Sequence, residues 1–199
     1  MSIVRDHIKE IREGQPFTVG SLRHLASADN LRQILNRLMK NDEIRRVSRG
    51  VYVKPKHEPR LGETLPLVRE IAEIIAKSTG ETIAIHGAEA ARQLGLTTQV
   101  PMRLVLNTSG NTRKIKVKNQ SVLLKHVSPS KLIAPGTLSG TVISALMYLG
   151  KEHVTQDTLK KIKDQLVKED FERIFDQIEY MPAWLANIFY HFQKGHSNE

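Results

Sequence analysis

The first forty residues repeat apolar positions at a spacing that predicts three helices. Residues 2–12 carry apolar side chains at helical spacing, and Gly14 ends this run. Thr18 is suited to cap a short second helix that passes through Leu25. A third helix is predicted over residues 30–40. Its buried stripe consists of Leu31, Ile34, Leu35 and Leu38.

The next residues change to the spacing of a β-hairpin. Residues 44–47 predict one strand, residues 48–50 a turn, and residues 51–53 the returning strand. Pro55 and Pro59 bracket a segment that reads as a polar linker. Helices followed by a basic hairpin are the order of elements in a winged helix-turn-helix, so we expect residues 1–58 to form such a DNA-binding domain.

Residues 59–199 predict a small mixed sheet with helices, followed by a helical C-terminal end. A strong apolar helix ends at Gly80, and a short apolar run at residues 82–85 predicts a buried strand. Alternating residues between 102 and 127 predict three further strands, and the chain is helical from Thr141 onward. The expected fold class is therefore α+β, with residues 59–199 as a second, α+β effector domain.

Charge is distributed unevenly along this chain of net charge +9. Residues 1–60 hold 13 Lys and Arg against 7 Asp and Glu, and residues 90–151 hold nine Lys and Arg with no acidic residue. The last 48 residues reverse the balance, with 6 basic and 9 acidic residues. This asymmetry indicates a polyanionic partner for the first two regions, although an ordinary basic surface would carry the same charge.

The outward face of the predicted third helix combines cations with amides. Such side chains reach base edges in the major groove, while arginines around the hairpin turn at Gly50 would contact phosphates. The expected DNA-contacting residues are Asn30, Arg32, Gln33, Asn36, Arg37, Lys40, Arg45, Arg46, Ser48 and Arg49. Any one of these residues could be an ordinary solvent-exposed side chain. The prediction therefore depends on finding all of them on one helix and the following hairpin. Tyr52 is expected to pack in the core.

A second group of basic residues lies on a predicted strand of the middle region. It consists of Arg113, Lys114, Lys116 and Lys118. These side chains either extend the DNA-binding surface or face an acidic partner; a merely solvated sheet face is the third reading.

Patterns typical of catalysis are missing from the sequence. It contains no Gly-rich phosphate loop ending in Lys-Ser/Thr, no His-Glu-x-x-His and no Gly-x-Ser-x-Gly. Residues 90–151 contain no Asp or Glu, so the predicted middle strands offer no carboxylates to bind a metal ion. Glu81 and Glu89 flank His86, but a histidine that caps the following helix is the favoured interpretation. We expect no metal, no cofactor and no enzymatic activity.

The cellular compartment of the protein is inferred from features that the sequence lacks. It has no cysteine, no uninterrupted apolar run long enough to span a bilayer, and no apolar export segment among its first residues. These features predict a cytoplasmic protein with no membrane partner.

Several motifs resemble the N-terminal winged helix of AbiEi-like antitoxins, which belong to type IV toxin–antitoxin systems linked to phage abortive infection. They are Phe17-Thr18, the helix Asn30–Lys40 and the segment Ile44–Tyr52 with its Arg-Gly-Val-Tyr ending. The likeness continues through Ile85-His86-Gly87 and Gly95-Leu96. It implies a domain that binds inverted repeats in its own promoter, and a C-terminal domain that counters a nucleotidyltransferase-like toxin.

The sequence thus predicts a DNA-binding transcriptional regulator, the autorepressing antitoxin of a toxin–antitoxin system in phage defence. Its partners would be double-stranded DNA and a nucleotidyltransferase-like toxin. Two alternatives stay open. One is a winged-helix module that docks another protein without binding DNA. The other is a nucleic-acid-processing enzyme that uses Glu81, His86 and Glu89.

Overall fold

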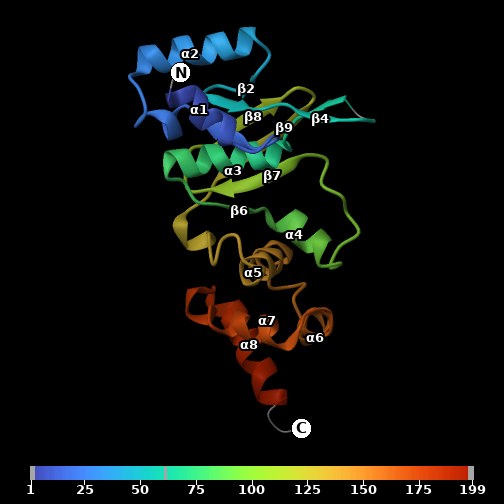
Figure 1. Cartoon of the computed structure of the whole chain (residues 1–199). Helices are drawn as coiled ribbons and strands as arrows, with labels where there is room; N and C mark the ends of the chain where they lie inside the picture. Colours follow the sequence, from blue (N-terminus) through green and yellow to red (C-terminus); the bar gives the residue numbers. More distant parts are fainter. Residues whose placement is uncertain (1–2, 61, 197–199) are drawn as a thin grey trace. The chain divides into compact units, whose positions relative to one another are not determined.

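The N-terminal elements follow one another in the order helix, strand, helix and hairpin (Figure 1). The computed structural model describes residues 3–60 and 62–196. The first elements are α1 (Ile3–Glu10), β1 (Pro16–Thr18), the 3₁₀ turn η1 (Gly20–Leu22), α2 (Ala28–Lys40), β2 (Arg45–Ser48) and β3 (Val51–Val53). The three strands pair antiparallel in the order β1-β3-β2. The α+β class expected from the sequence is confirmed.

Helix α2 forms where the apolar spacing predicts a helix. Ser27 precedes it in an extended conformation, and the helix ends at Lys40 with Asn41 as its C-cap. Leu31, Leu35 and Leu38 are buried on its inner face, where they join the core of this region. Ile34, which was also expected in the buried stripe, is only half-buried at its edge, as is Met39. Since residues three and four apart share one face of a helix, the polar positions of α2 are left to solvent.

The expected short second helix is reduced to one 3₁₀ turn, and Thr18 lies in a strand instead of capping a helix. Phe17 explains the difference. Its ring is buried and stacks on Tyr52 with ring centroids 6.0 Å apart, so residues 16–18 extend along β3. The Thr18 hydroxyl oxygen still accepts a hydrogen bond from the Ser21 N–H. The core position expected for Tyr52 is confirmed.

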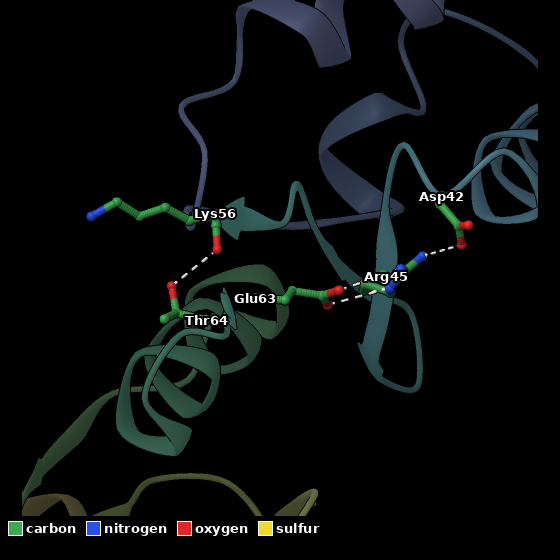
Figure 2. A network of polar contacts seen from close by, with 5 residues as sticks. All are labelled: Asp42, Arg45, Lys56, Glu63 and Thr64. Carbon is green, nitrogen blue, oxygen red and sulfur yellow. Dashed lines mark hydrogen bonds and ion pairs between the residues drawn. The ribbon is translucent and has the colours of Figure 1, made fainter. Parts of the chain in front are cut away.

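The segment expected to be a polar linker forms a second hairpin. Strands β4 (Lys56–Glu58) and β5 (Gly62–Thr64) pair antiparallel, and the Thr64 hydroxyl donates to the Lys56 carbonyl oxygen at 3.2 Å (Figure 2). Pro55 lies immediately before the first of these strands, where its missing N–H costs no ladder hydrogen bond.

Helix α3 (Val68–Thr79) ends at Gly80, which adopts the left-handed conformation with φ of 69°. This helix packs against β1. One compact unit of the chain therefore comprises Met1–Glu81 together with Lys114–Val122, and the domain boundary expected near residue 58 falls inside it.

The second unit comprises Thr82–Arg113 and Leu123–Glu199. The middle elements of the chain are β6 (Ile83–Ile85), α4 (Gly87–Gln93), β7 (Leu104–Thr108), β8 (Arg113–Val117), β9 (Gln120–His126) and the 3₁₀ turn η2 (Pro129–Lys131). Their strands form a four-stranded sheet in the order β6-β7-β9-β8. The four strands predicted between residues 82 and 127 are thus all present.

The C-terminal end is helical, as expected. It consists of α5 (Leu138–Leu149), α6 (Gln156–Gln165), α7 (Lys168–Phe175), the 3₁₀ turn η3 (Ile178–Tyr180) and α8 (Ala183–His196). Thr155 caps α6, and the apolar side chains of α5, α6, α7 and α8 meet in one core with the alanines of α4. Phe171, Phe175 and Phe189 make edge-to-face ring contacts there.

Candidate nucleic-acid interface

The outward face of α2 is polar along its whole length. Six of the predicted DNA-contacting residues lie on it, and all are exposed: Asn30, Arg32, Gln33, Asn36, Arg37 and Lys40. Leu31 and Leu35, on the opposite face, are at most 1% exposed. Burial of the leucine stripe therefore presents the cations and amides to solvent as a row.

One carboxylate shares the exposed surface of α2. Asp29 lies 3.7 Å from the Arg32 guanidinium, and both side chains are more than three-quarters exposed, so this ion pair contributes little energy. In the part of the chain that the structure describes, Arg37 and Lys40 have no carboxylate partner within ion-pair distance. Their charges are available to an outside anion.

The β2–β3 hairpin carries exposed arginines at and near its turn. Gly50 adopts φ of 73°, which the turn requires and which other residues rarely accept. Arg46 and Arg49 are exposed, and Ser48 is half-buried. A register shift lies between Arg46 and Ser48, and the Arg46 Nε donates a long hydrogen bond of 3.4 Å to the Ser48 carbonyl oxygen. This weak contact leaves most of the guanidinium unbound.

Arg45 differs from the other predicted contact residues, because two carboxylates already bind it. Its Nη1 donates to Asp42 at 2.5 Å, and its Nε and Nη2 approach the two Glu63 carboxylate oxygens at 3.3 Å (Figure 2). These hydrogen bonds raise the pKa of Arg45 further above its ordinary value. The side chain therefore joins the β2 strand to the β4–β5 hairpin, and we remove it from the set of DNA-contacting candidates.

Sequence reasoning missed this arrangement because Glu63 is 18 positions from Arg45 and belongs to a hairpin that was expected to be a linker. Asp42 was the available signal, three residues before Arg45. It adopts φ of 58° just after α2, a conformation that Asp accepts more readily than most residues.

The second basic group follows the strand pattern expected for it. On β8, Lys114 and Lys116 are exposed, whereas Ile115 and Val117 are buried. Lys118 is exposed and lies in the turn after β8 with φ of 48°. Arg113 is half-buried, and its Nη1 donates to the Asn111 carbonyl oxygen at 3.2 Å. The alternation along β8 therefore places these lysines together on an exposed face of an edge strand.

Residues 3–174 match the family model described as a family of unknown function, DUF6088. The chain belongs to this family. The match covers α2, both N-terminal hairpins, the four-stranded sheet and the helices through most of α7. No curated protein and no solved structure matches the chain.

The remaining candidate residues of this DUF6088 protein lie around the start of α4. The His86 Nδ1 accepts the Ala88 N–H at 3.3 Å, so His86 caps the helix, as the favoured interpretation predicted. The Glu89 carboxylate accepts from Arg92 at 2.6 and 2.8 Å, and Glu81 accepts from the Thr79 hydroxyl. Both glutamates of the possible acid–base group are therefore engaged by other side chains.

Two kinds of site are absent from residues 3–60 and 62–196. No group of three or more His, Cys, Asp or Glu side chains is placed to hold a metal ion. No helix has both the length and the apolar composition needed to cross a bilayer.

Proposed function

We propose that this protein binds duplex DNA through α2 and the β2–β3 hairpin, and that it is a sequence-specific transcriptional regulator without enzymatic activity. The observation that carries the proposal is the outward face of α2. Its two unpaired cations, Arg37 and Lys40, share that face with the amides of Gln33 and Asn36. Arginine pairs with guanine and amides pair with adenine in the major groove, so this composition suits base readout.

The arrangement around α2 supports a winged helix-turn-helix over residues 1–58. The β2–β3 hairpin follows α2 directly along the chain, which is where a wing follows a recognition helix. The 3₁₀ turn η1 stands in the place of the helix that precedes a recognition helix. Arg46 and Arg49 are exposed on this hairpin and would bind phosphates. Phosphate contacts fix the register of the protein on DNA, while base contacts select the sequence.

The resemblance to AbiEi-like antitoxins extends the proposal to a biological role. The protein would repress its own operon through inverted repeats in the promoter and counter a nucleotidyltransferase-like toxin, as part of a phage-defence system in the cytoplasm. A strain that carries the neighbouring reading frame under an inducible promoter tests this role. Growth arrest that this protein relieves supports the antitoxin function, and arrest that it leaves unchanged contradicts it.

DNA binding is tested by selecting sites from a random duplex library and measuring affinity for selected and scrambled duplexes by fluorescence anisotropy. Arg37→Ala and Gln33→Ala should each reduce the preference for the selected site by about 1–3 kcal/mol. Arg49→Ala should weaken binding to both duplexes equally and lower the salt slope by about one.

Lys77→Ala is the matched control, because Lys77 is an exposed cation of the same unit on α3, outside the proposed surface. It should leave both the preference and the salt slope unchanged. Equal losses in Lys77→Ala and Arg37→Ala would place the DNA elsewhere. Absence of any binding would instead favour a winged helix that docks another protein.

A further inference from the structure

A small cavity in the second unit is lined by basic and hydrogen-bonding side chains from four segments of the chain. Its volume is about 210 Å³. The polar side chains lining it are His86, Asn107, Lys125, Lys131, Ser144 and Tyr148. None of its described lining residues is an Asp or a Glu. All six except His86 lie in the stretch from residue 90 to residue 151 that has no acidic residue.

The lack of a carboxylate matters, because a cavity with two ammonium groups and no internal counter-ion favours an anion from outside. Lys125 lies near the end of β9 and Lys131 ends η2, and both side chains are exposed. Elsewhere in the described chain, many cations have a carboxylate partner, as Arg92 has in Glu89. The cavity thus concentrates positive charge at one place in the unit.

His86 contributes a hydrogen-bond donor. Burial and, to a lesser degree, the charge of Lys125 lower the pKa of His86, so the neutral imidazole is favoured. Its Nδ1 accepts the Ala88 N–H, which requires the proton of the neutral ring to sit on Nε2. The ring also lies against Tyr148, with centroids 5.9 Å apart, which restricts its orientation.

The wall of the cavity is closely packed. A Cβ atom on Gly87 would lie 2.5 Å from the Ser144 carbonyl oxygen and 2.3 Å from the Tyr148 Cβ, so α4 and α5 approach to a distance that only glycine permits. The Ser144 hydroxyl donates to the Ile85 carbonyl oxygen at 3.0 Å and joins α5 to β6. The backbones of α4, α5 and β6 are therefore held close together beside the cavity.

We propose that this cavity binds the phosphate group of a small molecule, with Lys125 and Lys131 neutralising its charge. His86, Asn107 and Tyr148 supply hydrogen-bond donors to the remaining phosphate oxygens. Lysine is suited to this task as a compact point charge, and charge-assisted hydrogen bonds to phosphate are stronger than neutral ones.

A neighbouring cavity indicates how a larger ligand would fit. It has a volume of about 370 Å³, shares His86 with the first, and is lined by Ala88, Pro101, Met102 and Val105 together with the charged side chains of Glu89 and Arg103. A phosphate group held beside His86 has this mainly apolar space within reach of its organic substituent. The phosphate source is therefore either free inorganic phosphate or a nucleoside monophosphate whose base occupies the second cavity.

Isothermal titration calorimetry on the full chain distinguishes these sources, with inorganic phosphate, AMP and adenosine titrated at constant ionic strength. AMP should bind, and inorganic phosphate should displace it. The double variant Lys125→Gln/Lys131→Gln should lose at least about tenfold in affinity for both. His86→Asn keeps an acceptor for the Ala88 N–H and removes the Nε2 donor, so it should lose roughly threefold to tenfold.

Lys151→Gln removes an exposed cation of the same unit that does not line the cavity, and it should bind both ligands as the wild type does. Arg37→Ala should also bind them unchanged, which separates this site from the DNA-binding surface. Tighter binding of AMP than of phosphate identifies a nucleotide site, and equal binding identifies a site for free phosphate. Absence of binding, or equal losses in Lys151→Gln and the double variant, would overturn the proposal.

Discussion

The outward face of α2 and the cavity beside His86 in the second unit are both basic. They differ in shape and in the kind of cation that each presents. The α2 face is an open row of arginines, one lysine and amides along 13 residues of helix. The cavity has a volume of about 210 Å³ and is lined by two lysines and a histidine. A guanidinium presents a flat fork for paired contacts, whereas an ammonium is a point charge. Net charge alone would not separate a surface suited to a double helix from one suited to a single phosphate.

The surroundings of the cations differ as well. Arg37 and Lys40 lie on the exposed face of a helix that packs on the rest of its unit through the buried leucines of its opposite face. The cavity is enclosed by segments that pack on one another at the glycine contact of α4 with α5. Changes to the leucine stripe should therefore affect the first surface, and changes to the glycine contact should affect the second.

The largest effect is expected for Leu35→Ala. Leu35 is 1% exposed, and its removal leaves a cavity beneath α2, so the free energy of unfolding should fall by about 2–5 kcal/mol. Urea denaturation followed by circular dichroism measures this loss. Leu67→Ala is the control, because Leu67 is 61% exposed and its loss should change stability by less than about 0.5 kcal/mol. Similar losses in the two variants would contradict the burial of the leucine stripe.

A smaller loss is expected for Gly87→Ala. The added Cβ would overlap the backbone oxygen of Ser144, and separating α4 from α5 should cost about 1–3 kcal/mol. Fluorescence of Trp184, the single tryptophan of the chain, reports unfolding of the same unit. Phosphate affinity should fall together with stability, while DNA affinity should not change.

Gly195→Ala is the control for this substitution, because nothing lies within 4 Å of the position that a Cβ would take there. Alanine is the better helix former, so this variant should be as stable as the wild type or slightly more stable. Unchanged stability in Gly87→Ala would mean that α4 and α5 are farther apart than the structure has them.

Local patterns predicted most of what forms the α2 surface. The spacing of Leu31, Leu35 and Leu38 determines which face of the helix is buried, and Gly50 marks the hairpin turn; both features are read within a few residues. The same periodicity predicted that the six polar residues of α2 are exposed, and the structure confirms it.

The sequence could not predict the parts that depend on residues distant along the chain. The pairing of Arg45 with Glu63 requires the β4–β5 hairpin, whose three-residue strands are too short for a clear alternation. The cavity requires His86, Lys125 and Ser144 to come together from separate elements. The sequence shows that residues 90–151 contain no acidic residue, but it does not show which lysines of this stretch line the same cavity.

Two neighbouring arginines on β2 test the distinction between a structural cation and a DNA-binding one. Arg46→Met should lower the salt slope of DNA binding by about one, because it removes a phosphate contact. Arg45→Met should leave the slope unchanged and reduce thermal stability slightly, because Asp42 and Glu63 lose their partner. Anisotropy titrations over a range of salt, with melting curves of each variant, measure both quantities. A slope that falls equally in the two variants would return Arg45 to the DNA-contacting set.

The smallest effect concerns pH. Burial and Lys125 lower the pKa of His86 in the folded state below its ordinary value of about 6.5, so the unfolded chain binds more protons at this position. This contribution to stability is present when the pH lies above that ordinary value, and it is lost as the pH falls below it.

His86→Asn should therefore lose less stability than the wild type when the pH is lowered from about 7.5 to about 5.5. Lys125→Gln should give an intermediate result, because burial is the larger cause. Melting curves at both pH values measure the difference, with His57→Asn, at an exposed position of β4, as the control for loss of an imidazole. An identical pH response in His86→Asn and the wild type would mean that His86 is as well hydrated in the folded protein as in the unfolded chain.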